Sequence, residues 1–274
     1  MEKHAVEPVA FKQLPHGISS FLLKCIAMIS MVTDHVGSLF FPNVSVLNAF
    51  GRLAFPIYCF LICNGFFHAK KRSVYLGRLM GFAALSQIPF TLLRLAERDL
   101  PAVTLLRRFH LLFDKLNSLF VLSLGLFTLI LLDLLRKRYS GLGHFVGLMT
   151  AAGLTLFSWL IHCEYCFLGI PLIVAFYEAH LLCSTKASSL LGIYYGTRFF
   201  LPVAAVALYV LLRCVVDATP LHSTFMFGLC QTAAVFLTVF YSGKQGYKNK
   251  FFQYGFYIFY PAHLVLLVII HAIL

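Results

Sequence analysis

Apolar stretches of about twenty residues follow one another from residue 18 to the end of the chain, separated by short polar segments. A helix needs about 20 consecutive apolar residues to cross the hydrocarbon core of a bilayer. The stretches of this length are 18–41, 50–68, 75–95, 117–135, 142–162, 165–183, 188–212, 221–241 and 251–273. The pattern predicts an all-α, polytopic bundle of about nine transmembrane helices that forms one domain over residues 1–274.

The composition agrees with this pattern. Hydrophobic residues make up 60% of the 274 residues and charged residues only 12%, whereas charged residues make up about 25% of a soluble protein. The first apolar run is long, polar inside and without a small-residue cleavage site, so it is not expected to be a signal peptide. The longest connection between predicted spans is 96–116. It contains residues 105–113, whose pattern is typical of an amphipathic helix at the membrane interface.

The formal net charge of +12 raises the question of nucleic-acid binding. Such binding needs basic residues clustered on one face or arm, and here they lie in short connections between apolar segments. Lys and Arg are more frequent in the segments on the side of the N-terminus. The positive-inside rule therefore predicts a cytoplasmic N-terminus, and no nucleic-acid partner is expected.

Four basic residues lie inside the predicted spans, namely Lys24, Arg52, Arg78 and Arg198. An ionisable group near the bilayer centre costs roughly 2.5–3.5 kcal/mol on insertion scales. Asp34 is the only carboxylate well inside an apolar segment, so most of these cations lack an obvious partner. Each could instead extend to the lipid headgroups. As a set they indicate a ligand that brings its own anionic groups, such as a phosphorylated molecule.

The first segment combines a base with a histidine. Lys24 and His35 are eleven residues apart, which places them on one helix face and roughly 16 Å apart along the axis. Histidine titrates near neutral pH and can take a proton from an attacking amine or hydroxyl, which makes His35 a candidate general base. Asp34 points about 100° away around the helix. A purely structural histidine, hydrogen-bonded between helices, is the alternative.

The last segment carries a second polar sector in Tyr257-Ile258-Phe259-Tyr260-Pro261-Ala262-His263. Prolines bend helices and free backbone carbonyls, which a membrane bundle tolerates next to a cavity. Such prolines stand within or beside predicted spans at positions 56, 89, 171, 202 and 261. We expect a cavity lined in part by Tyr260 and His263, although ordinary proline enrichment in membrane helices explains some of these positions. The eight cysteines lack a zinc spacing, so no metal site is expected.

Several blocks of this sequence resemble the TraX family, in family order along nearly the whole chain. They are LKCIA at 23–27, MVTDHVG at 31–37, GRLAFPI at 51–57, NGF at 64–66, YLGRL at 75–79, SQIPF at 86–90, NSLF at 117–120, EYC at 164–166, GIP at 169–171 and YIFYPAHL at 257–264. Glu164 and Cys166 depart from the family pattern, where aspartate and glycine are usual.

The resemblance implies a membrane acyltransferase of the bacterial inner membrane that takes acetyl-CoA from the cytoplasm. The acceptor would be an amine or hydroxyl, on a peptide N-terminus such as a pilin or on a surface glycan, met within or beyond the membrane lipid. Lys24, Arg52 and Arg78 would hold the donor. His35 would be the base with Asp34 tuning its charge, and His263, Tyr260, Asn64 and Gln87 would contact substrates, with Asn64 a candidate for the oxyanion.

Two other functions fit the same residues. A transporter for an anionic solute also uses intramembrane bases and bent helices, although this sequence shows no internal repeat. A non-enzymatic assembly protein is the other alternative, and it would give the buried bases no purpose. The roles of Arg198 and Glu164 stay open.

Overall fold

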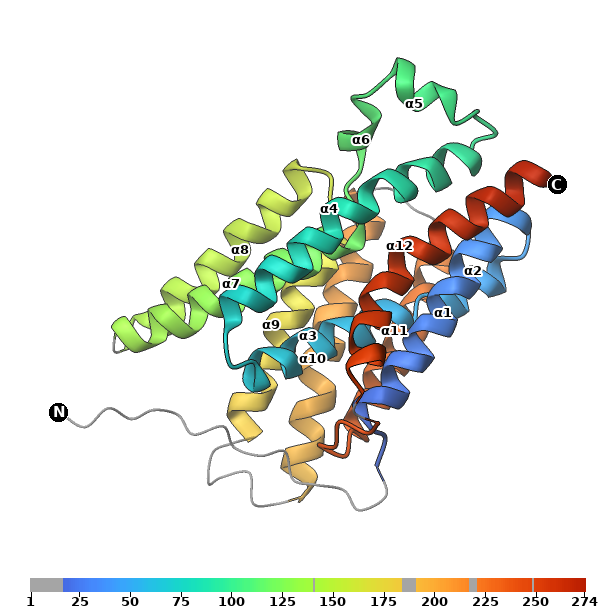
Figure 1. Ribbon diagram of the computed structural model, residues 1–274. Helices are drawn as coiled ribbons and strands as arrows, with labels where there is room; N and C mark the ends of the chain where they lie inside the picture. Colours follow the sequence, from blue (N-terminus) through green and yellow to red (C-terminus); the bar gives the residue numbers. More distant parts are fainter. Residues whose placement is uncertain (1–16, 140, 184–190, 217–220, 248) are drawn as a thin grey trace.

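The computed structural model describes residues 17–139, 141–183, 191–247 except 217–220, and 249–274. The regular elements in this part are all helices (Figure 1). Two isolated β-bridges lie outside the helices. They are α1 Ser20–Phe40, α2 Ser45–Gly51, α3 Ala54–His68, α4 Arg72–Ala96, α5 Val103–Arg107, α6 Leu111–Asp114, α7 Ser118–Arg138, α8 Gly143–Leu160, α9 Cys166–Cys183, α10 Leu191–Val216, α11 Leu221–Val239 and α12 Lys250–Ile273.

Eight of the helical stretches are long and apolar enough to cross a membrane, with α2 and α3 counted together as one stretch. The described part of α11, Thr224–Val239, is apolar but shorter. Eight of the nine predicted segments therefore coincide with such stretches and the segment 221–241 with the shorter α11, and the prediction of a polytopic helical membrane protein is confirmed. The second segment begins earlier than predicted, at Ser45, because α2 precedes the break near Arg52.

The long connection differs from its prediction. Residues 105–113 do not form one amphipathic helix, since α5 ends at Arg107 and α6 begins at Leu111. Arg108 leaves the helical conformation at φ −130° and ψ 65°. Phe109 and Phe113 are 65% and 66% exposed, whereas Leu105 and Leu112 are buried with Leu95 in a small hydrophobic cluster of their own. Both short helices stand at the end of the bundle opposite the start of α1 (Figure 1).

The interior of the bundle lies where α3, α7 and α9 pack together. Ile57, Leu126 and Ile173 have no exposed surface there. Gly125 lets α7 approach α9 closely, since a Cβ at this position would lie 2.3 Å from Cδ1 of Ile173. Small residues at such crossings are what helix association in lipid requires. Outside this centre, α1 and α4 both pack beside α12.

The segment between α11 and α12 folds back onto the start of α1. The backbone N–H groups of Ser20 and Phe21 donate to the carbonyls of Lys244 and Gln245, at 3.0 and 3.2 Å. Ser19 caps the helix by accepting from the N–H of Leu22. These bonds satisfy amide groups that every helix start leaves free, and they fix one wall of the cavity described next.

Candidate functional site

A cavity of about 550 Å³ opens at the end of the bundle where α1 and α12 begin and α3 ends. Its walls come from α1, α3, α4, α7, α12 and the segment after α11. Lys24 on α1 and Arg78 on α4 both line it. The structure therefore brings together two of the four intramembrane bases.

Neither base is neutralised within the described residues. The Nε of Arg78 is buried there without a hydrogen-bond partner, and no carboxylate lies within ion-pair distance of either side chain. Lys24 instead places its Nζ 4.9 Å from the ring centroid of Phe256. Both side chains are half-buried, and a cation without a partner in apolar surroundings is costly, so the cavity is suited to an anionic ligand.

The inner end of the cavity is formed by Met31 and Tyr260. The Tyr260 hydroxyl lies 3.3 Å from Oγ of Ser118, which fixes its position on α12 relative to α7. Met31 lies seven residues beyond Lys24 on α1, or roughly 10 Å along the axis. The cavity is thus a long channel that follows α1 from its first turns toward the middle of the helix.

A pair of imidazoles lies one helical turn beyond this inner end. The rings of His35 and His263 are 5.4 Å apart between centroids, and Tyr260 contacts the His263 ring edge-on at 5.7 Å. Neither histidine lines the cavity. Met31 and Tyr260 line the cavity one turn before His35 on α1 and His263 on α12, so a ligand that extends from the cavity to the imidazoles has to pass these two side chains.

The position of the His263 proton follows from its hydrogen bond. Nδ1 lies 2.8 Å from the carbonyl oxygen of Phe259, and because a carbonyl only accepts, Nδ1 carries the hydrogen and donates it. Nε2 is then the unprotonated nitrogen of the neutral ring. It is buried and has no hydrogen-bond partner, so its lone pair is free to accept a proton.

Asp34 and Arg52 form a second polar cluster with Tyr165. Arg52 lies 3.7 Å from Oδ2 of Asp34 and donates to the Tyr165 hydroxyl at 2.6 Å. The Tyr165 hydroxyl oxygen accepts this bond. Gly51 allows the close approach, since a Cβ there would lie 2.3 Å from Cβ of Asp34. The structure therefore separates Arg52 from Lys24 and Arg78.

Asn64 lines the cavity, whereas Gln87 does not. Asn64 donates to the Tyr241 hydroxyl at 3.2 Å, and its Oδ1 is buried without a partner. Gln87 donates to the carbonyls of Leu112 and Lys115 and accepts from Asn117. Gln87 thus holds the connection before α7 against α4.

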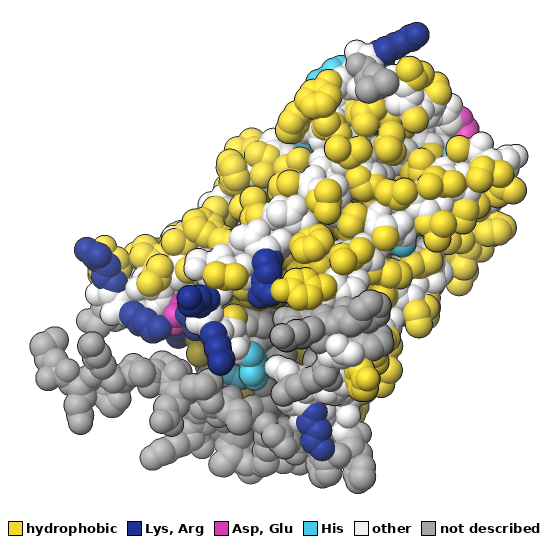
Figure 2. Space-filling view, in the orientation of Figure 1, with side chains coloured by type: hydrophobic (Ala, Val, Ile, Leu, Met, Phe, Trp, Pro, Cys, Tyr) yellow, Lys and Arg dark blue, Asp and Glu magenta, His cyan; other side chains and the backbone are white. Residues whose placement is uncertain are grey.

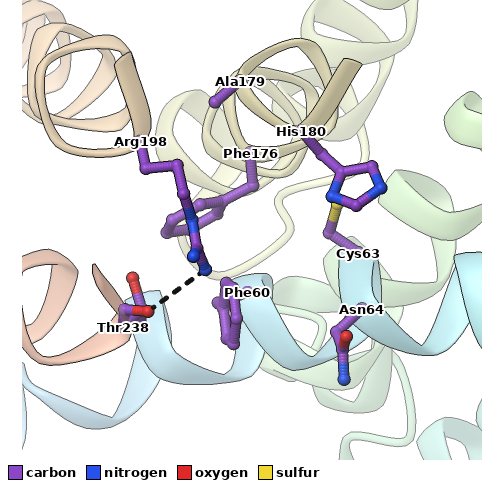
Figure 3. Close-up of a pocket in the computed structure, with 8 residues that line it drawn as sticks. All are labelled: Phe60, Cys63, Asn64, Phe176, Ala179, His180, Arg198 and Thr238. Carbon is purple, nitrogen blue, oxygen red and sulfur yellow. Dashed lines mark hydrogen bonds between the residues drawn. The ribbon is translucent and has the colours of Figure 1, made fainter. Parts of the chain in front are cut away.

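Arg198 borders a separate small pocket of about 10 Å³, which has room for about one water molecule. The side chain is 6% exposed and donates to the carbonyl of Thr238 at 3.5 Å. Figure 3 shows it reaching from its helix toward Thr238 and Phe60, with His180 and Cys63 on the other side of the pocket. Asn64 also borders this pocket and is the residue that it shares with the large cavity.

The family model described as "TraX protein" matches residues 19–271. The chain belongs to the TraX family. The match contains the whole cavity, the histidine pair and the Asp34–Arg52 cluster. The resemblance noted from the sequence blocks is therefore confirmed.

The chain is also similar to two curated proteins. The chain is 32% identical over 262 residues to a probable fimbrial assembly protein FimC, serogroup H1, of Dichelobacter nodosus, covering 91% of this chain and 94% of the relative. It is 32% identical over 72 residues to an uncharacterized protein of Rickettsia prowazekii (strain Madrid E), covering 26% of this chain and 27% of that protein. No solved structure matches the chain.

The structure adds site residues of this TraX family member that sequence reasoning missed. Met31 closes the inner end of the cavity, and Phe21, Tyr247 and Phe256 line its mouth. Aromatic residues near segment ends are also typical of interfacial belts, so the sequence could not assign them to a cavity. Met31 carried one usable signal, which is its position on the face shared by Lys24 and His35.

Proposed function

We propose that this chain is an integral membrane acyltransferase that transfers an acetyl group from cytoplasmic acetyl-CoA to an amine or hydroxyl acceptor. The observation that supports it best is one continuous arrangement along α1. Two unneutralised cations border a channel at its open end, and an imidazole pair lies one turn beyond its closed end. A long donor with phosphates at one end and a thioester at the other matches this order of groups.

Lys24 and Arg78 would bind the anionic end of the donor. Charge-assisted hydrogen bonds to phosphate are stronger than neutral ones. Both cations are also partly desolvated before the ligand arrives, so binding loses less of their hydration. Arg52 would act elsewhere, because it is paired with Asp34 beside His35. Its proposed role is to hold Asp34 and Tyr165 in place next to the reacting groups.

The transfer would proceed in a ternary complex of enzyme, donor and acceptor. His35 accepts the proton of the acceptor nitrogen or oxygen as that atom attacks the thioester carbonyl carbon. The carbon–sulfur bond then breaks, and the imidazolium returns the proton to the departing thiolate, which leaves as free CoA. Acetyl and proton balance without any further reactant. Asp34 lies next to His35 in the chain and would stabilise its transient positive charge.

Charge distribution supports a cytoplasmic opening of the cavity. Basic residues gather at the end where α1 begins, including Lys70, Lys71 and Arg72 between α3 and α4 and Arg136, Lys137 and Arg138 at the end of α7. In Figure 2 most of the dark blue side chains on this face lie toward that end. By the positive-inside rule this end faces the cytoplasm, where acetyl-CoA is available, and the membrane would be the bacterial inner membrane.

The name of one relative bears on the chemical class of the acceptor. The Dichelobacter nodosus protein is named for fimbrial assembly, which favours a peptide acceptor, such as the N-terminus of a pilin subunit, over a surface glycan. Such an acceptor would approach His35 from the side of the Asp34–Arg52 cluster. This side faces away from the open end of the cavity, so donor and acceptor would enter from opposite faces.

The test uses the purified full chain in lipid nanodiscs with acetyl-CoA labelled in the acetyl group. We expect acetyl transfer to peptide acceptors, or slow thioester hydrolysis without them, and at least a 100-fold loss in His35→Ala, because general acid–base catalysis contributes about 10²–10⁴-fold. His144→Ala is the matched control, since His144 lies on α8 and is 47% exposed beside Glu178.

Two results would overturn the proposal. Equal rates in His35→Ala and wild type would remove the histidine from the reaction. Uptake of an anionic solute into proteoliposomes, without any dependence on acetyl-CoA, would instead favour a transporter. If the protein showed neither acetyl transfer nor uptake, a non-enzymatic assembly role would be favoured.

A further inference from the structure

Three aromatic side chains line the mouth of the cavity, and we call Phe21, Tyr247 and Phe256 the mouth cluster. The ring of Phe21 lies 5.8 Å from that of Phe256 and 6.2 Å from that of Tyr247, in both cases edge-on. All three side chains line the cavity, and Tyr247 is 64% exposed, so the cluster offers aromatic surface to a ligand at the entrance.

The mouth cluster lies directly beside the phosphate-binding cation. Lys24 follows Phe21 by three residues, which places both side chains on the same side of α1. Its Nζ lies 4.9 Å from the centroid of Phe256. Arg78 borders the same cavity with an Nε that has no hydrogen bond. A flat stacking surface and two cations therefore share one entrance.

The backbone fixes this arrangement before any ligand binds. The segment that carries Tyr247 is bonded to the start of α1 through Ser20 and Phe21. Gly246 has φ +76°, and a Cβ there would lie 2.8 Å from Oγ of Ser19. Only glycine adopts this conformation without strain. The position of Tyr247 beside Phe21 is thus built into the loop, which lowers the entropy that a ligand loses on binding.

We propose that the mouth cluster stacks on the adenine ring of the donor nucleotide, while Lys24 and Arg78 bind its phosphates. This inference deepens the proposed function and rests on it, because it names the part of acetyl-CoA that the entrance recognises. Base–aromatic stacking is favourable for any purine. An anionic lipid headgroup would use the cations but has no ring for the cluster, so the aromatic residues distinguish the two ligands.

The test compares two acetyl donors that differ only in the nucleotide, acetyl-CoA and S-acetyl-pantetheine. In Phe256→Leu and Phe21→Leu we expect the KM for acetyl-CoA to rise about tenfold or more with little change in kcat, since each variant removes an aromatic ring on which the base stacks. The KM for S-acetyl-pantetheine stays at its wild-type value. Phe256→Trp restores the KM for acetyl-CoA, because it returns an aromatic face.

The matched control is Phe145→Leu, which removes a 60% exposed ring on α8 away from the cavity and should leave both KM values unchanged. Equal changes for the two donors in the mouth-cluster variants would indicate a merely structural role and overturn the inference. Unchanged KM values for both donors would overturn it as well.

A binding measurement separates this inference from the proposed function. Adenosine 3′,5′-bisphosphate, the nucleotide part of CoA, should bind the wild-type protein in calorimetry and bind at least tenfold more weakly to Phe256→Leu. Binding of the bisphosphate by a protein without transferase activity would refute the proposed function alone. Acetyl transfer without bisphosphate binding, or competition only by phosphatidylglycerol vesicles, would refute the mouth-cluster inference alone.

Discussion

The two ends of α1 differ in whether their charged side chains have partners. At its start, Lys24 faces Arg78 across a cavity, and no described carboxylate neutralises either cation. Toward its end, Asp34 pairs with Arg52, and Arg52 also donates to Tyr165. Both regions lie in apolar helices of the same bundle, so the surroundings alone do not explain the difference.

The comparison indicates which charges serve the fold and which serve a ligand. An ion pair that is already formed offsets the desolvation of both partners and leaves little binding energy for a third group. Unpaired cations leave that energy unused until an anion arrives. In the proposed function, the open end of α1 would bind the donor and the far end would hold the residues around His35.

Blocking the channel between the two regions should have the largest effect. Met31→Trp adds bulk at the inner end of the cavity, so we expect acetyl transfer to fall at least 100-fold while adenosine 3′,5′-bisphosphate binds as in wild type. Paired calorimetry and transfer assays measure both. Met31→Leu, which conserves volume, is the control and should retain most activity. Normal transfer in Met31→Trp would mean that the donor reaches His35 by another path.

Breaking the formed ion pair should mainly lower stability. Arg52→Met leaves Asp34 without its partner. The two side chains are 25% and 15% exposed, so we expect a loss between the about 0–1 kcal/mol of an exposed pair and the about 3–5 kcal/mol of a fully buried one. Thermal unfolding in detergent should show this loss in the free energy of unfolding. The double variant Arg52→Met with Asp34→Asn should recover part of it, because no lone charge remains. A double variant no more stable than Arg52→Met would show that the pair contributes through packing alone.

Removing the unpaired cations should weaken donor binding without lowering stability. Lys24→Met and Arg78→Met delete charges without partners, so we expect stability to stay constant or rise, while the KM for acetyl-CoA increases about tenfold. A hydrogen bond to a charged group is worth about 1.5–3 kcal/mol. The salt dependence of KM should also weaken in both variants. A marked loss of stability in either variant would contradict the distinction between the two regions.

The smallest effect is expected at Glu164, on the turn before α9. Its carboxylate lies 3.5 Å from Nζ of Lys115, whose side chain is 40% exposed. Exposed pairs contribute about 0–1 kcal/mol, so Glu164→Gln should change the unfolding midpoint little and leave KM unchanged. Lys115→Met serves as the reciprocal control. A large loss of transfer in Glu164→Gln would place this carboxylate with Asp34 in the acceptor region.

The hydrophobic pattern was enough to predict the helices. The length of an apolar run is fixed by bilayer thickness, so eight of the predicted segments coincide with helices of spanning length and one with the shorter described part of α11, and the all-α prediction holds. The hydrophobic pattern was less reliable in the connections. Residues 105–113 do not form the continuous helix that their pattern predicted, because Arg108 leaves the helical conformation. The shared face of Lys24, Met31 and His35 also follows from helix periodicity alone.

Only the tertiary structure decided which intramembrane charges have partners. The sequence could not distinguish Arg52 from Lys24 and Arg78, since pairing depends on which helices become neighbours and how the turn at Gly51 approaches Asp34. It likewise gave no signal that Phe21 and Phe256, at the starts of the first and last long helices, meet at one entrance. Contacts between distant helices arise from packing, which the periodicity of a single segment does not encode.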